Sequence, residues 1–146
     1  MPPKDEPFWQ AVDRIREAEP RYRREAYGFL MFALASTVEA LPRERRDDPE
    51  RRHLTGPELV QGLLGCAARE FGVMAATVFD EWAVRRPEDV GVMVFHLVEA
   101  GQLSARPEDR REDFAGGPGL IESLRVERRP PSPDRARGPA GPGVST

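Results

Sequence analysis

Cysteine is almost absent from this chain, because Cys66 is the only one among 146 residues. A single thiol cannot form a disulfide within the chain, which is typical of a reducing compartment such as the cytoplasm. Long apolar runs are absent too: no stretch reaches the roughly eighteen residues that a membrane-spanning helix needs. The N-terminal MPPKDEPFW has no apolar segment behind a basic flank. We therefore expect no membrane span and no signal peptide, and we predict a cytoplasmic protein.

Lysine and histidine are also scarce, with Lys4 the only lysine and His53 and His96 the only histidines. These histidines and Cys66 form the only Cys/His set that could supply a nucleophile with its base, or a metal site. Cys66 falls on an apolar helical stripe, so an inert buried thiol is the simpler interpretation. His96 has only Glu99 one turn later, and a structural metal site needs four ligands. No glycine-rich loop follows a strand. We predict no catalytic residue, no cofactor and no metal, and hence no enzyme.

Charge of one sign does not dominate the chain. Charged residues make up 32% of the sequence, and the formal net charge is −3. A weakly acidic balance argues against general binding of polyanions such as nucleic acids. The length leaves room for one domain with one hydrophobic core.

Apolar residues three and four positions apart predict a mainly α-helical domain. Proline in a first helical turn, as at Pro57 and Pro87, marks two of the helix starts. Thr55 and Glu58 have the spacing of a capping box, the strongest start signal in the chain. The predicted helices cover about residues 7–18, 20–41, 55–71, 74–83 and 87–101.

Two helices carry further information about packing. In the helix at 20–41, Phe29 and Phe32 widen the apolar stripe, so we expect burial on more than one side. In the helix at 55–71, Gly62 and Gly65 each cost about 1 kcal/mol relative to alanine. Close approach of another helix would compensate for that cost.

The connections complete the predicted domain. The charged segment 42–52 is expected to be a solvated connector with no binding role. Residues 102–105 and 110–114 could pair as a small β-hairpin around a turn at Pro107. Phe114 would then pack on the helix at 87–101 near Val94 and Leu97, or on Trp82 across the turn. With Leu54 as a first strand, the order of elements would resemble a winged helix, a fold that often binds nucleic acid.

The composition changes at Gly116, which sets the predicted domain boundary. Residues 7–115 form the helical domain, and residues 116–146 form a Gly/Pro/Arg-rich segment without aromatic residues. This segment holds five arginines against three acidic residues, and Leu120 to Val126 could form one weak helical turn. The composition predicts a disordered C-terminus, because so little apolar surface cannot offset the entropy of ordering.

Several motifs in this sequence resemble those of a family of small uncharacterised bacterial proteins. They are HLTGPEL, the FG between two helices, EWAVRRPEDVG, LVEAGQLS and REDF, together with the preceding YGFLMFAL. The resemblance covers roughly residues 8–115. It implies a compact, cytoplasmic, bacterial protein, and no activity is assigned to the family.

The polar segments EWAVRRPED and REDF are the places where a binding surface is expected, since polar loop residues often serve recognition. The alternative is structural, with Glu88 and Asp89 as helix caps. The candidate surface consists of Arg85, Arg86, Glu88, Asp89, Arg111, Glu112 and Asp113. We predict a non-enzymatic protein–protein interaction module with an unidentified protein partner and no membrane association. The alternative function is nucleic-acid binding by a winged-helix-like fold.

Overall fold

The computed structural model describes residues 6–49, 51, 53–103, 114 and 117–128. In this part the chain is mainly helical. The elements, in order, are α1 (Phe8–Ala18), α2 (Arg24–Glu39), α3 (Arg43–Arg46), α4 (Gly56–Phe71), the 3-10 helix η1 (Gly72–Met74), α5 (Ala75–Glu81), α6 (Pro87–Glu99) and α7 (Leu120–Arg128).

The mainly helical fold class is confirmed, and α1, α2, α4, α5 and α6 occupy the segments that the apolar spacing predicted. The count of five helices was wrong, because α3 lies in the predicted connector and α7 lies beyond the predicted boundary. No strand occurs in the described residues, and Leu54 lies in irregular backbone. The hairpin and the winged-helix arrangement therefore find no support, and most of the hairpin falls at 104–113, outside the described residues.

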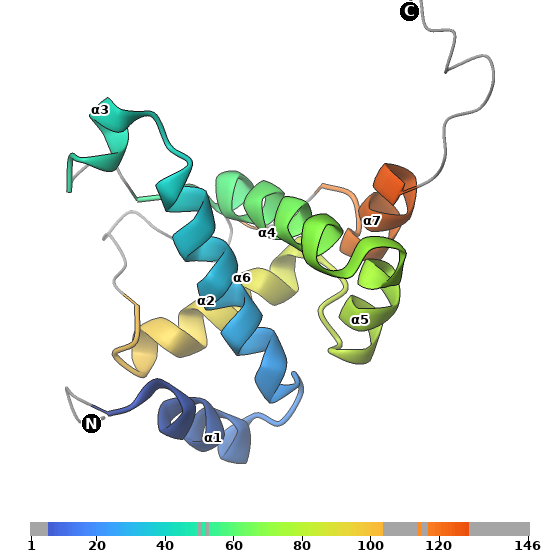
Figure 1. The fold of residues 1–146 in the computed structure, drawn as a ribbon. Coiled ribbons are helices and arrows are strands. Elements are labelled where there is room, and N and C mark those ends of the chain that lie inside the picture. Colours follow the sequence, from blue (N-terminus) through green and yellow to red (C-terminus); the bar gives the residue numbers. More distant parts are fainter. Residues whose placement is uncertain (1–5, 50, 52, 104–113, 115–116, 129–146) are drawn as a thin grey trace, which may run out of the picture.

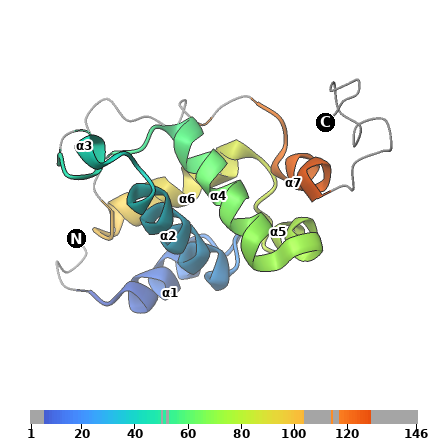
Figure 2. The same ribbon diagram turned by 45° about the horizontal axis from the view of Figure 1, so that its top comes forward.

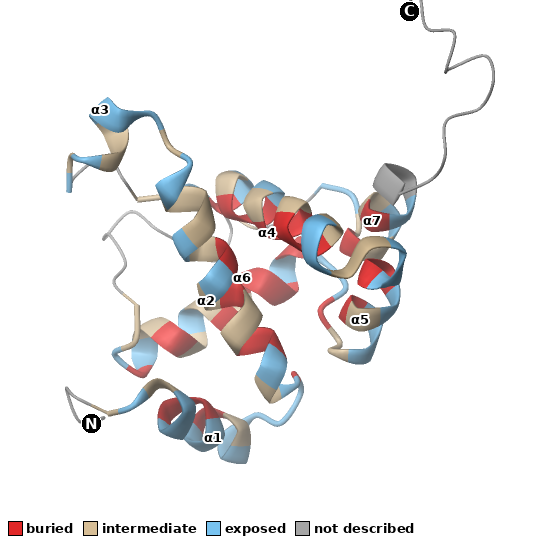
Figure 3. Ribbon diagram, viewed as in Figure 1, coloured by how far each residue is buried: buried red, intermediate tan, exposed pale blue. Residues whose placement is uncertain are grey.

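Helices α2 and α4 run side by side across the middle of the molecule, and α6 passes behind them (Figures 1 and 2). Helix α1 packs against α2 and α6, and α7 packs against α4 and α5. The buried residues lie on the faces that these helices turn toward one another (Figure 3). The largest fully buried side chains include Tyr22, Tyr27, Leu30, Phe79 and Leu97. This core fixes the relative positions of α1, α2, α4, α5, α6 and α7.

The contact between α2 and α4 explains one of the two glycines flagged in the sequence. A Cβ on Gly62 would collide with the side chain of Thr37 on α2, whereas a Cβ on Gly65 would meet only the guanidinium of Arg69, at 3.5 Å. Thr37 is held in place, because its hydroxyl donates a hydrogen bond to the carbonyl of Ala33 at 2.7 Å. Gly62 is thus required by close helix packing, and Gly65 is not.

Alanine substitutions at these glycines should therefore have opposite effects on stability. Gly62→Ala should destabilise the protein by about 1–2 kcal/mol, since overpacking outweighs the gain in helix propensity. Gly65→Ala should stabilise it by about 0.5–1 kcal/mol. Urea denaturation of the two variants and the parent measures both values. Equal stability of the two variants would contradict the close packing of α2 on α4.

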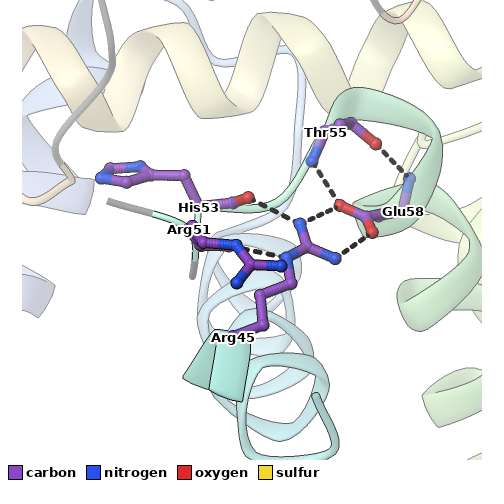
Figure 4. Close-up of polar contacts among 5 residues, drawn as sticks. All are labelled: Arg45, Arg51, His53, Thr55 and Glu58. Carbon is purple, nitrogen blue, oxygen red and sulfur yellow. Dashed lines mark hydrogen bonds and ion pairs between the residues drawn. The ribbon is translucent and has the colours of Figure 1, made fainter. Parts of the chain in front are cut away.

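The predicted solvated connector is organised around a single arginine (Figure 4). The guanidinium of Arg45 donates to both carboxylate oxygens of Glu58, one of them at 2.7 Å, and to the carbonyls of Arg51 at 2.6 Å and His53 at 3.0 Å. Glu58 also accepts a hydrogen bond from the backbone N–H of Thr55 at 2.8 Å, which completes the predicted capping box. Arg45 thereby joins α3 to the start of α4.

The same cluster should give the protein a pH-dependent stability at acid pH. The hydrogen bond from Arg45 is the main cause that lowers the pKa of Glu58 from 4.5 to about 2. A lowered carboxyl pKa contributes stability above the unfolded-state value, and this contribution is lost as the pH falls toward the folded-state value. Relative to the parent, Glu58→Gln should therefore lose stability near neutral pH.

Chemical denaturation over about pH 6 to pH 2.5 measures the difference in unfolding free energy between the parent and Glu58→Gln. This difference should shrink as the pH falls from 4.5 toward about 2, the unfolded-state and folded-state pKa values of Glu58. Glu44→Gln, at an exposed carboxylate of α3, is the matched control and should follow the parent throughout. A difference for Glu58→Gln that is independent of pH would show that the ion pair with Arg45 is not formed in solution.

The boundary predicted at residue 115 was wrong, because α7 is part of the core. Leu120 and Leu124 are both 0% exposed, and the N–H of Leu120 donates to the carbonyl of Arg85 at 2.8 Å. Residues 129–146, where the rest of the disordered segment was predicted, lie outside the described residues. The domain therefore extends at least to α7.

Phe114 packs on α6, as predicted, but nearer the start of the helix than expected. Its ring lies over Gly91, so close that a Cβ there would be 2.9 Å from the Cδ2 atom. Phe114 is half-buried against the core. Gly91 thus makes room for an aromatic ring that the sequence pattern had placed near Val94 and Leu97.

One helical stretch of the described residues, Gly56–Glu81, is long and apolar enough by length and composition to cross a membrane. It has 26 residues and a mean hydropathy of 1.3 in its most apolar window, so it is an exception to the expectation of no such segment. The backbone turns at Gly72, whose φ is 55°. The 16 residues of α4 before this turn span about 24 Å, less than the roughly 30 Å of a bilayer core. Length and composition alone are therefore weak evidence for a span.

Candidate protein-interaction surface

Four of the seven candidate residues lie at the start of α6, and one of them is buried. Asp89 is 6% exposed, and no other charged residue in the described part of the chain is buried. Its Oδ1 accepts hydrogen bonds from the hydroxyl of Tyr22 at 2.7 Å and from Arg21 at 3.1 Å. Its Oδ2 accepts from the backbone N–H groups of Arg85 and Arg86, both at 3.0 Å. The structural interpretation, a helix cap, therefore holds for Asp89.

The hydroxyl of Tyr22 shares the buried environment of Asp89. Burial, followed by the hydrogen bond to the carboxylate, raises the pKa of Tyr22 well above its ordinary value. The tyrosine therefore stays protonated and donates to Asp89 over the whole physiological range. This contact joins the segment before α2 to the start of α6.

The other candidate residues do not form the binding surface that the sequence predicted. Arg85 is bound to Asp80, because its Nε donates to the carboxylate at 2.8 Å and its terminal nitrogen to the carbonyl at 3.0 Å. Arg86 and Glu88 are exposed at the beginning of α6. Arg111, Glu112 and Asp113 lie outside the described residues. The structure thus brings Arg85, Arg86, Glu88 and Asp89 together as a helix start.

A different surface, which the sequence patterns missed, is formed by four aromatic rings from three parts of the chain. The ring of Phe29 lies 5.9 Å from that of Phe32, 5.1 Å from that of Phe71 and 5.7 Å from that of Trp82, measured between centroids. Phe71 and Trp82 are 5.7 Å apart, edge to face. Phe32 is 47% exposed, and the other three are partly exposed. We call these four residues the aromatic surface.

The positions of these rings follow from the local structure. Phe29 and Phe32 are three residues apart on α2, so they lie on neighbouring parts of one helix face. Phe71 ends α4, where the positive φ of Gly72 turns the chain into η1. Trp82 follows α5 and stacks on the buried ring of Phe79, with centroids 5.7 Å apart. The buried Phe79 thus packs against the partly exposed rings of Phe29 and Trp82.

Helix α2 is buried on more than one side, as expected, because it packs against α1 and α4 and its Tyr27 bonds to His96 of α6, but Phe32 lies on a face that is left exposed. Two residues of η1, which follows Phe71 in the chain, are exposed as well: Val73 at 76% and Met74 at 53%. The signal that could have found this surface is the excess of large apolar residues around α2, since a helix that is apolar on several sides needs cover on each of them. No other described element covers Phe32.

The hollow next to Phe114 offers little for a substrate. A hollow of about 290 Å³ lies between α4, α6 and α7, with Val60, Leu64, Phe114 and Leu120 in its wall. Its volume is at the lower limit of small-molecule pockets, which hold several converging polar groups. Here the hydroxyl of Ser123 is already bonded to the carbonyl of Gly119 at 3.0 Å. Among the described residues, no three His, Cys, Asp or Glu side chains are grouped so as to hold a metal ion.

Comparisons of this chain with protein-family models, with curated proteins and with solved structures found no match. The resemblance to a bacterial family therefore stays a prediction from the motifs.

Proposed function

We propose that the protein is a non-enzymatic protein–protein interaction module that binds its partner through the aromatic surface. The observation that supports this most directly is the exposure of Phe32 beside three further rings that are partly exposed themselves. Aromatic residues are enriched in protein interfaces and supply much of the binding energy there. A bacterial origin and a cytoplasmic location belong to the same proposal, and they rest on the motifs and on the lone cysteine.

Recovery of partners from a lysate, with and without nuclease, tests this function. Phe32→Asp places a charge on the most exposed ring of the aromatic surface and should weaken capture about 30-fold, the effect of losing about 2 kcal/mol at an aromatic residue of the interface. Because Phe32 is half exposed, the variant should remain folded. The partner should still be captured after nuclease treatment of the lysate.

Gln10→Asp is the matched control, since it adds the same charge at an exposed position of α1, which packs mainly against α2 and α6. It should capture the same partners as the parent. Partners that disappear after nuclease treatment would favour the alternative, a nucleic-acid-binding protein. Equal capture by Phe32→Asp and Gln10→Asp would reject the aromatic surface as the binding site.

A further inference from the structure

Two exposed carboxylates are adjacent in sequence to residues of the aromatic surface. Glu70 precedes Phe71, Glu81 precedes Trp82, and both carboxylates are exposed. Within the described part of the chain neither of them forms an ion pair. The neighbouring Arg69 donates to the sulfur of Cys66 at 3.2 Å and so lies along α4. A ligand with apolar rings and positive charge would complement this surface.

The C-terminal segment of the same chain has this chemistry. Residues 129–137 read RPPSPDRAR, with prolines at 130, 131 and 133 and arginines at 129, 135 and 137. In a polyproline II helix, which has about three residues per turn, Pro130 and Pro133 project from the same side. Proline-rich segments of this kind bind to grooves lined with aromatic residues, and their restricted backbone lowers the entropic cost.

The point where α7 ends places this segment within reach. Helix α7 ends at Arg128 and packs against α4, α5 and η1, and η1 directly follows Phe71. The 18 residues after Arg128 could span about 56 Å in polyproline II conformation, at 3.1 Å per residue. Helix α4 itself is only about 24 Å long. By its length alone, the chain after Arg128 can therefore reach Phe71 and Trp82.

We propose that the aromatic surface is occupied in cis by residues 129–137 of the same chain, with Pro130 and Pro133 stacked on the rings and an arginine paired with Glu70 or Glu81. A partner then binds by displacing this segment. The inference concerns the regulation of the surface and so rests on the proposed function. A short tether gives an effective concentration of about millimolar, so a contact of millimolar intrinsic affinity is occupied about half of the time.

Fluorescence of Trp82 in the full-length protein tests the proposal. Trp9 is the only other tryptophan, so a Trp9→Phe background isolates the signal. In that background, Pro130, Pro131 and Pro133 are replaced together by serine. Acrylamide quenching of Trp82 should roughly double, because the segment shields the ring in about half of the parent molecules. A peptide of residues 129–146, added at about millimolar concentration, should restore the shielding.

Pro139→Ser with Pro142→Ser is the matched control, since it removes prolines outside the proposed contact and should leave quenching unchanged. Equal quenching in the triple-serine variant and this control would overturn the proposal. Shielding that falls on dilution would assign the surface to the segment of a second copy, which overturns the cis arrangement. A failure here leaves the capture experiment with Phe32→Asp unaffected, so the inference and the proposed function fail separately.

Discussion

Replacing Asp89 with alanine should lower the free energy of unfolding by about 3–5 kcal/mol, the usual effect of removing one partner from a buried charged network. The carboxylate is 6% exposed and accepts four hydrogen bonds. Its loss leaves the buried Tyr22 hydroxyl and two part-buried backbone N–H groups without their acceptor. The segment before α2 would then lose its polar connection to α6.

Urea denaturation of Asp89→Ala and of a control, Asp80→Ala, measures this effect. Asp80 also pairs with an arginine, but its side chain is 60% exposed. An exposed ion pair contributes about 0–1 kcal/mol, so the control should be close to the parent. Asp89→Asn keeps the shape and one acceptor and should lie between them. Equal stability of the two alanine variants would place Asp89 on the surface and revive its predicted role in binding.

Leu124→Ala should destabilise the protein by about 2–5 kcal/mol, although the residue lies beyond the domain boundary that composition predicts. Leu124 is 0% exposed, and α7 packs against α4 and α5. Truncation of a buried leucine removes apolar contact and leaves a cavity. Thermal unfolding should detect the change, since 1 kcal/mol corresponds to roughly 2–4 °C in a chain of this size.

Glu122→Ala is the control for this prediction, because Glu122 is exposed on the same helix. Its effect should stay within about 0.5 kcal/mol. If Leu124→Ala melts with the parent, α7 does not belong to the core, and the composition-based boundary is the correct one.

The helices with long apolar stripes could be predicted from the sequence, because periodicity and capping are local. The capping box of Thr55 and Glu58 formed as expected. Helix α7 was predicted only as one weak turn, because it has nine residues and lies in a Gly/Pro-rich context that favours disorder. The role of Arg45 was missed because it pairs with Glu58, which is 13 residues away. Such a contact depends on the path of the connector.

The candidate surfaces were harder to predict than the fold. Asp89 has the sequence pattern of an exposed first-turn carboxylate, and it is buried only because Tyr22 approaches from a distant part of the chain. Phe32 has the pattern of a core residue, yet no described element covers it. Periodicity shows which residues are apolar on a helix, but tertiary packing decides how many of them are covered.

Photo-crosslinking from position 32 tests most directly the claim that the aromatic surface binds the partner. A photoreactive phenylalanine analogue replaces Phe32 in one protein and the exposed Gln10 in another, and both are irradiated in nuclease-treated lysate. The account predicts a covalent adduct between position 32 and the protein that the parent captures, and no such adduct from position 10. Capture of that protein without an adduct at position 32 would contradict it.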